Sequence, residues 1–187
     1  TMLLLHNQHC LEKMREEQAT LCSESQNLDF ETVSNMSYLQ DCVKEALRMY
    51  PPLIMLMRYC HEDTEVTAKG QRYVIPKGDI VVSSPAVHMR LPDVFKDPDT
   101  FDPERFSEER GEHKVPFAYL GFGAGIHACL GQQFGLLQVK TIVSILLRNF
   151  DLEPVDKEVP EPDFKAMVVG PTNHLRVRYR KRADATI

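Results

Sequence analysis

The sequence predicts a mainly α-helical fold with small β-sheets, an α+β arrangement. Three features predict it: segments with apolar residues at helical spacing, short alternating segments bounded by turn residues, and a proline-rich middle stretch. At 187 residues the chain is long enough to bury the core of one domain. Apolar residues make up 43% and charged residues 26%, which argues against a disordered chain or a fibrous repeat.

Two helices are predicted in the first fifty residues. The first covers 8–21 and the second covers 37–50, and the polar residues 22–36 between them are expected to form a loop. In the second helix Ser37 is followed three residues later by Gln40. This is the spacing of a capping box, in which two side chains satisfy backbone N–H groups at the start of a helix. A proline pair ends the helix.

A charged pair on the second helix is predicted from its pattern to be exposed. Glu45 and Arg48 are three residues apart and lie away from the apolar stripe. Such pairs usually lie at the surface and contribute roughly 0.2–0.5 kcal/mol. The later motif Pro103-Glu104-Arg105-Phe106, taken alone, is typical of an ordinary loop.

Short strands are predicted after the second helix. Residues 53–60 are expected to form a strand with Leu53, Met55 and Met57 on one face. Turn residues bracket three further strands, near 65–67, 72–75 and 80–84. The proline-rich segment 91–118 is expected to be a long packed loop.

The last third of the chain is predicted to be a helix followed by strand. Residues 130–149 form a strong helical pattern, apolar on nearly all sides in its second half, and are expected to be central. Near the end, Leu175, Val177 and Tyr179 alternate with arginine, which predicts a strand with one solvated face. The basic cluster there is interpreted as a solvated edge rather than a binding patch.

Charge and cysteine content exclude several classes of protein. Acidic residues outnumber basic ones by 27 to 22, a net charge of −5, which argues against a nucleic-acid binder. The apolar run at 2–5 is far shorter than the roughly 20 residues of a membrane span. An odd number of cysteines without a C-x-x-C pair argues against a zinc ribbon or a disulfide scaffold, and favours a reducing compartment. The opening at Thr1, without a methionine, predicts a fragment or a processed piece.

The glycine-rich segment before the last helix allows three interpretations. Gly123, Gly125 and Ala128, with Asp151 further on, partly fit a dinucleotide-binding fingerprint, although no βαβ unit is predicted. Alternatively Cys129, at a helix N-terminus where the helix dipole favours a thiolate, is a metal ligand of the kind that promotes O–O cleavage at haem iron. The third interpretation is a glycine turn with an inert cysteine.

Three motifs together change the interpretation, because they occur in the order found in one family. They are Glu45-x-x-Arg48, Pro103-Glu104-Arg105-Phe106 and Phe122-Gly-x-Gly-x-His127-x-Cys129-x-Gly131. They resemble the cytochrome P-450 superfamily of haem-thiolate monooxygenases, over essentially the whole chain. His127, where most of the superfamily has Arg, is similar to the sterol 14α-demethylase family, as are segments 51–58, 135–141 and 167–172. One departure is Leu175, where many members carry Cys, but this position takes no part in the chemistry.

The resemblance implies a role for each matching residue. Cys129 would bind the iron of haem b, and Phe122 would shield its sulfur. His127 and Arg58 would neutralise the haem propionates. The tight loop would need its glycines, which are Gly123, Gly125 and Gly131. Glu45, Arg48 and Arg105 would form a buried network under the haem, which reverses the surface interpretation of the first two.

The resemblance also implies a substrate, partners and a location. Leu53, Met55, Met57, Met167 and Val168 would line a sterol cavity, although plain core packing is the alternative for each. The full enzyme would remove the sterol 14α-methyl group with O₂ and NADPH-derived electrons from a cytochrome reductase. It would bind azole-type inhibitors, bind no nucleic acid, be a monomer and lie on the cytosolic face of the endoplasmic reticulum membrane.

The resemblance further implies that residues 1–187 are the C-terminal part of one cytochrome P-450 domain. Residues 1–6 resemble the tail of the helix that crosses over the haem. The N-terminal half, with the proton-delivering pair and the membrane anchor, would lie upstream, so the chain alone is expected to be inactive. Two alternative functions stay open: a cytochrome P-450 acting on a fatty acid or xenobiotic, and a haem-free nucleotide-binding α/β protein.

Overall fold

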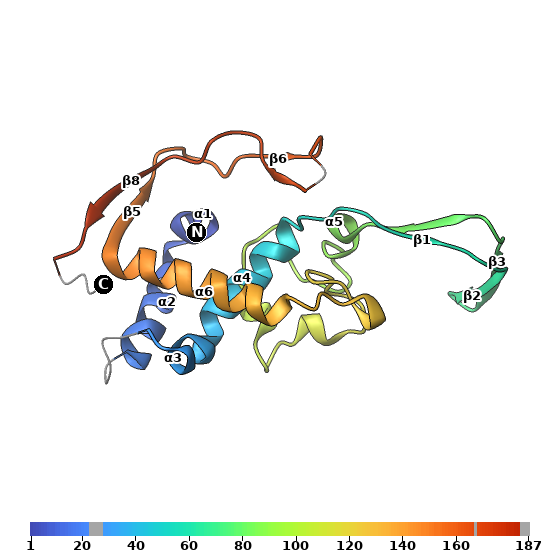
Figure 1. Ribbon diagram of the computed structural model, residues 1–187, viewed down its shortest axis with the longest axis horizontal. Coiled ribbons are helices and arrows are strands. Elements are labelled where there is room, and N and C mark those ends of the chain that lie inside the picture. The colour runs from blue at the N-terminus through green and yellow to red at the C-terminus, as the bar shows by residue number, and fades with distance from the viewer. Residues whose placement is uncertain (23–27, 167, 184–187) are drawn as a thin grey trace.

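The computed structural model describes residues 1–22, 28–166 and 168–183, and it has the predicted α+β character (Figure 1). A helical body carries pairs of strands at both ends, and α6 runs through its middle. The helices of the described residues are α1 (Met2–His6), α2 (Gln8–Leu21), α3 (Phe30–Asn35), α4 (Ser37–Met49), α5 (Pro85–His88) and α6 (Gln132–Asn149). Three short 3₁₀ turns are η1 (Pro103–Phe106), η2 (Glu112–Lys114) and η3 (Gly125–His127).

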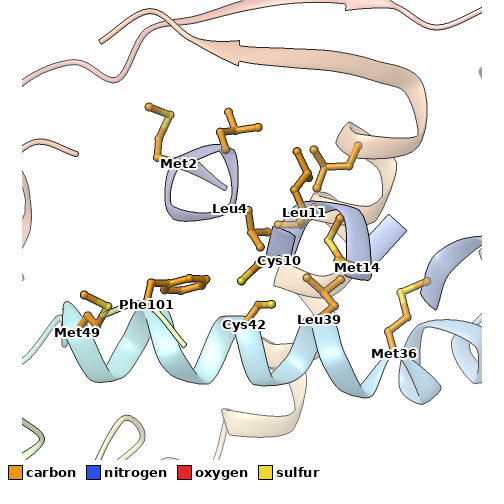
Figure 2. Packing of buried hydrophobic residues seen from close by; sticks show 13 residues of the cluster. Met2, Leu4, Cys10, Leu11, Met14, Met36, Leu39, Cys42, Met49 and Phe101 are labelled. Carbon is orange, nitrogen blue, oxygen red and sulfur yellow. The ribbon is translucent and has the colours of Figure 1, made fainter. Parts of the chain in front are cut away.

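The main core lies where α2, α4 and α6 meet. Cys10 and Met14 of α2 face Cys42 and Leu39 of α4 across this interface (Figure 2). Leu147 of α6 joins the same buried cluster. Burial of these apolar side chains, each contributing about 1.5–3 kcal/mol, fixes α4 and the residues on its far face relative to α6. None of the described helices has the length and apolar character needed to cross a bilayer.

The expected loop at 22–36 is only partly correct, because α3 lies inside it. The side chain of Asp29 accepts a hydrogen bond from the backbone N–H of Thr32 at 2.8 Å. This is an N-cap, and it was a signal available in the sequence. Lys140 of α6 then holds the end of α3, since its Nζ donates to the carbonyls of Ser34 (3.0 Å) and Met36 (3.4 Å). Burial lowers the pKa of Lys140.

The predicted capping box at Ser37 is wrong. The N-cap of α4 is Met36, and Ser37 is already helical. The carboxylate of Glu17, from α2, accepts hydrogen bonds from the N–H groups of Tyr38 (2.6 Å) and Leu39 (3.0 Å). A carboxylate is favoured at a helix N-terminus by the helix dipole, so a residue twenty positions away does what the local motif was expected to do.

The strands of the described residues form four antiparallel pairs. They are β1 (Leu56–Tyr59) with β4 (Ile80–Ser83), β2 (Thr64–Ala68) with β3 (Gln71–Ile75), β5 (Phe150–Pro154) with β8 (Val177–Lys181), and β6 (Pro162–Asp163) with β7 (Gly170–Pro171). The strand predicted at 53–60 is therefore shorter, and it begins at Leu56. The first two pairs extend away from the helical body as an arm (Figure 1).

Two predictions about the end of the chain need correction. The last helix begins at Gln132 rather than Leu130, and one side of it is exposed, including Phe134 and Ile142. Strand β8 is exposed on both faces rather than one, because a two-stranded sheet covers little of its own surface. Its contact with β5 includes an edge-to-face pair between Tyr179 and Phe150, with ring centroids 5.8 Å apart.

Candidate functional site

The glycine-rich segment forms a closed loop directly before α6. The backbone N–H of Cys129 donates to the carbonyl of Phe122 at 2.8 Å, which joins the two ends of the loop. Within it, η3 is closed by the N–H of Ala128, which donates to the carbonyl of Gly125 at 3.1 Å. The ring of Phe122 lies near Gly135 in the first turn of α6, where an added Cβ would be 3.9 Å from the ring.

Two glycines of this loop have left-handed backbone conformations. Gly123 has φ +73°, and a Cβ there would lie 3.0 Å from the carbonyl oxygen of His127. Gly125 has φ +61° and open space around it. At Gly131 the φ of −85° is ordinary, and an added Cβ would meet the Cys129 Sγ at a normal contact distance of 3.8 Å. The backbone therefore requires glycine at Gly123 and favours it at Gly125, but does not demand it at Gly131.

Replacing Gly123 with alanine is expected to destabilise the protein more than replacing Gly125 does. Each change places a side chain at positive φ, which costs about 1–2 kcal/mol. Only Gly123→Ala also pushes a methyl group against a backbone oxygen, which cannot move aside without opening the loop. Urea unfolding measures the free energy of unfolding of the two variants. Equal losses of this free energy would show that the close approach at Gly123 carries no cost.

Cys129 is exposed at the end of the loop, unlike the other four cysteines. Cys10, Cys42 and Cys60 are buried, and Cys22 is half-buried, while all five are free thiols. The apolar side chains flanking the thiol are also exposed, with Ile126 at 95% and Leu130 at 104% of their full accessibility. A polar thiol thus lies among uncovered apolar side chains, an arrangement suited to a flat apolar ligand that carries a metal.

Two cationic groups predicted at the site are exposed. Arg58 lies on β1, and its guanidinium Nη1 donates a hydrogen bond to the carbonyl of Met57 at 2.8 Å. His127 ends η3 and is exposed beside the thiol segment. Across the described ranges neither side chain has a carboxylate partner. Both remain available for an anionic group of a ligand.

Glu45, Arg48 and Arg105 are completely buried and in contact. Nε and Nη2 of Arg48 donate to the two carboxylate oxygens of Glu45 at 2.7 and 2.9 Å. Nε of Arg105 donates to Glu45 Oε1 at 3.0 Å. The surface interpretation of the helix pattern is therefore wrong: the face of α4 that carries Glu45 and Arg48 packs on η1, which carries Arg105, and Arg48 donates to the carbonyls of Met89 (2.9 Å) and Pro98 (2.6 Å) before it. A network of this kind fixes the loop segment against α4.

The predicted substrate-lining segments meet at one point. The N–H of Val169 donates to the carbonyl of Pro52 at 3.0 Å, which brings Val168 close to the segment that begins at Leu53. Leu53, Met55, Met57 and Val168 are all more than half exposed. Met167 lies outside the described residues. A nearby apolar cavity of about 400 Å³ is lined by Tyr50, Val169 and Leu175 instead, together with residues of α1 and 159–162.

The dinucleotide interpretation does not fit this geometry. Every strand pair in the described part of the chain is antiparallel. Gly123 lies outside these strands and forms an isolated bridge with Gly121. A phosphate-binding fingerprint requires a parallel βαβ unit. We find no group of three or more His, Cys, Asp or Glu residues within the described ranges that could together hold a metal ion. The candidate ligand is therefore the single thiol of Cys129.

Comparison with known proteins agrees with the geometry. Residues 2–178 match the cytochrome P450 family. The chain belongs to the cytochrome P450 family. A sterol 14-demethylase from Arabidopsis thaliana is 49% identical over 96% of this chain and 37% of its own length, and an obtusifoliol 14-alpha demethylase from Triticum aestivum is 45% identical over 96% and 40%. The chain thus spans less than half the length of these relatives.

Solved cytochromes of the same fold are similar over nearly the whole chain. The retinoic-acid-bound cyanobacterial CYP120A1 has a TM-score of 0.85 and 31% identity, and the match covers 97% of this chain and 40% of that one. The heme domain of a cytochrome P450DA mutant has a TM-score of 0.84 and 25% identity, covering 98% and 39%. The predicted α+β cytochrome P450 fold is confirmed.

Membership of this cytochrome P450 family implies a haem cofactor, and the residues present fit that group. Haem offers a flat apolar face, an iron that accepts a thiolate, and two carboxylates. The structure offers exposed apolar side chains at Ile126 and Leu130, an exposed thiol at Cys129, and two exposed hydrogen-bond donors at Arg58 and His127 that have no carboxylate partner among the described residues. Each chemical feature of the cofactor has a matching donor or surface.

Sequence reasoning missed two residues of the cytochrome P450 site region. Glu112 contacts Arg105, and Lys140 anchors α3 and α4 to the helix that follows the thiol loop. Lys140 contacts segments about a hundred residues away in the sequence. Glu112 contacts Arg105 between two short 3₁₀ turns. The apolar periodicity of the sequence predicts neither contact. A lysine on an otherwise apolar face of the last helix was the one local hint.

Proposed function

We propose that the whole protein is a sterol 14α-demethylase, a haem-thiolate monooxygenase that oxidatively removes the 14α-methyl group of a sterol. The loop that presents Cys129 carries the proposal, because an exposed thiol there stands between a glycine-dependent turn and a long helix. The names of the relatives from Arabidopsis thaliana and Triticum aestivum support the substrate class. Identity of 36% to a sterol 14alpha-demethylase of Mycolicibacterium vanbaalenii also supports it.

In this proposal the site holds haem b through residues of this chain. Bound haem supplies the activation of O₂ with electrons that derive from NADPH. Cys129 binds the iron as a thiolate, and Phe122 shields the sulfur from water. His127 and Arg58 form charge-assisted hydrogen bonds with the propionates. The three-glycine loop keeps the backbone close enough to hold the thiol in place, at Gly123, Gly125 and Gly131.

The sterol is held by the apolar segments that meet near Pro52. Leu53, Met55 and Met57 alternate along one side of an extended segment, and Val168 follows on the neighbouring turn, with Met167 proposed beside it. These side chains are exposed in this chain, so they are free to contact a sterol or the remainder of the domain. Flexible thioethers suit a flat hydrocarbon, because they adapt to its shape and exclude water from it.

The proposal extends to the remainder of the protein and its partners. Residues 1–187 are the C-terminal part of a single cytochrome P450 domain, and the N-terminal half with the proton-delivering pair completes the active site. Electrons come from an NADPH-cytochrome reductase, and azole-type inhibitors bind the same site. The protein is a monomer on the cytosolic face of the endoplasmic reticulum membrane. A net charge of −5 supports the absence of nucleic-acid binding.

Substrate binding to the haem-loaded protein tests the substrate class. Obtusifoliol or lanosterol is expected to shift the Soret band, whereas a long-chain fatty acid or retinoic acid is not. A shift with retinoic acid or the fatty acid and none with either sterol would assign the protein to another substrate class of the same family.

Two matched variants test the proposed wall in the same assay. Met55→Glu is expected to raise the apparent Kd for the sterol about tenfold or more, because an unpaired carboxylate is costly in an apolar site. Val74→Glu, on β3 and equally exposed at 55%, is expected to leave it unchanged. If both variants bind sterol like the wild type, the segment containing Met55 does not line the site.

A further inference from the structure

The buried network of Glu45, Arg48 and Arg105 has a net positive charge when these three residues are considered alone. Glu45 supplies one negative charge, while Arg48 and Arg105 supply two positive charges, and all three side chains have no exposed surface. A buried charge without a partner is strongly unfavourable. A second carboxylate is therefore required near one of the two guanidinium groups.

Glu112 is that carboxylate. Its Oε2 accepts a hydrogen bond from Nη1 of Arg105 at 2.7 Å, on the side of the guanidinium away from Glu45. The side chain of Glu112 is only 14% exposed. Its Oε1 accepts from Nε of Arg110 at 3.1 Å, and its Oε2 also receives the backbone N–H of Lys96 at 3.3 Å. Glu112 thus forms ion pairs with two arginines, the buried Arg105 and the surface-facing Arg110.

Every donor of the Arg105 guanidinium is occupied in this arrangement. Nε donates to Glu45, and one Nη1–H donates to Glu112. The other three bonds go to backbone carbonyls, those of Lys96 (2.8 Å), Asp97 (3.4 Å) and Thr100 (3.2 Å). Arg105 therefore organises the loop at 96–100, and loss of Glu112 would leave one of its N–H groups unpaired as well as its charge uncompensated.

The contacts close into a ring. Arg110 pairs with the carboxylate of Asp102, and the backbone N–H of Asp102 donates to Glu45 Oε1 at 3.0 Å. Including Asp102 and Arg110, the ring and its buried centre contain three acidic and three basic side chains, so the whole assembly is neutral. The exposed fraction rises outward, from 0% at Arg105 through 14% at Glu112 to 34% at Arg110.

We propose that Glu112 is a positioning residue of the haem site: it supplies the second counter-charge of Arg105 and so keeps Arg105 bound to Glu45. This inference rests on the proposed haem-thiolate function, and it adds a fourth member to the buried network. Among the described residues the Glu112 carboxylate accepts hydrogen bonds from Arg105, Arg110 and the backbone of Lys96, so it acts on the haem site through Arg105. The alternative is that Glu112 only forms a half-exposed ion pair with Arg110, which is worth little.

Three variants of the haem-loaded protein distinguish these possibilities, with transfer of haem to excess apomyoglobin as the measurement. Glu112→Gln keeps the shape of the side chain but removes its charge, and it is expected to lose haem about tenfold faster or more, because it leaves Arg105 one counter-charge short. Arg110→Gln is expected to stay within about twofold of the wild type, because Arg110 is the more exposed member of its pair and water can replace its hydrogen bond to Glu112. Glu112→Gln is expected to have the same effect in the Arg110→Gln background.

The outcomes that overturn the proposal are also clear. A Glu112→Gln rate within twofold of the wild type, or an effect that disappears in the Arg110→Gln background, would show that Glu112 serves Arg110 alone. If Glu112→Gln fails to fold, Glu112→Asp decides: a folded aspartate variant supports a charge role, and equal failure of both points to packing. A wild-type protein without the thiolate-type spectrum would instead overturn the proposed function.

A pH profile separates charge from packing without haem. Burial alone would raise the pKa of Glu112, but hydrogen bonds from Arg110 and Arg105 outweigh it and lower the pKa below the ordinary 4.5. A carboxylate with a lowered pKa stabilises the folded state above its unfolded pKa, and this contribution is lost as the pH falls through the folded pKa. The charged groups that face Glu112 are Arg105, Arg110 and, beyond Arg110, Asp102. These groups and the neighbouring His113 and Lys114 are present in both proteins, so the difference between the two pH profiles reports on Glu112.

The gap in urea midpoint between wild type and Glu112→Gln is therefore expected to be constant from pH 7 down to about 5 and to shrink at more acid pH. A gap that persists unchanged below pH 4 would show that the glutamine acts through shape, and it would overturn the charge role.

Discussion

Glu45→Ala is expected to lower the free energy of unfolding by about 3–5 kcal/mol and to prevent stable haem incorporation. Glu45 accepts hydrogen bonds from Arg48, from Arg105 and from the backbone N–H of Asp102. Removing the carboxylate leaves two guanidinium charges buried beside each other, and Glu112 can compensate only one of them. The loop held by Arg105 is then expected to detach from α4.

Asp41→Ala is the matched control on the same helix. Asp41 and Lys44 have the same three-residue spacing as Glu45 and Arg48, but their side chains are partly exposed, and such pairs are worth about 0–1 kcal/mol. Urea unfolding followed by far-UV circular dichroism, together with haem content, measures both variants. A Glu45→Ala protein that folds with full haem occupancy and loses less than about 1 kcal/mol would restore the surface interpretation of the helix pattern.

Most helices and strands were predictable because they follow local rules. The apolar spacing of 8–21 gives α2 with its predicted bounds, and the turn residues place β2, β3 and β4 within one or two residues. The helix start at Ser37 was also correct, but its capping was not. The Glu17 carboxylate that caps it comes from another helix, and no local spacing encodes a contact between two helices.

The helix wheel failed at Glu45 for an identifiable reason. A wheel assumes that one apolar stripe is buried and that the polar face meets water. Helix α4 is instead buried on two sides, against α2 and α6 on its apolar stripe and against η1 on its polar face. Only the order of three motifs along the chain, compared with a known family, indicated that the second face was covered.

The thiol loop follows local backbone rules, since its residues lie within ten positions of each other, and its assignment as a haem-binding site stays a prediction. The glycines, the cysteine and the start of the following helix occupy one continuous segment, and backbone rules apply directly to it. The role of Glu112 was not predictable in this way. Glu112 begins the short 3₁₀ turn η2, and its proposed role emerges only when the buried charges around Arg105 are counted.

Cys129→Ser is expected to abolish thiolate ligation of haem iron. A serine hydroxyl is a weak acid and a hard oxygen donor, so it does not provide the anionic sulfur that the proposed chemistry requires. The side chains are close in size and Cys129 is exposed, so the fold is expected to persist, and the loss belongs to the ligand rather than to packing. No other cysteine has flanking glycines or directly precedes a long helix.

The spectrum of the reduced CO complex tests the central claim most directly. Single Cys-to-Ser variants of the full-length protein at 10, 22, 42, 60 and 129 (numbered as in this chain) are compared with the wild type after haem loading. Only Cys129→Ser is expected to lose the red-shifted Soret band of a thiolate-ligated haem, while the other four keep it. A thiolate-type band that survives in Cys129→Ser, or that disappears with one of the other four changes in a folded protein, would contradict the account.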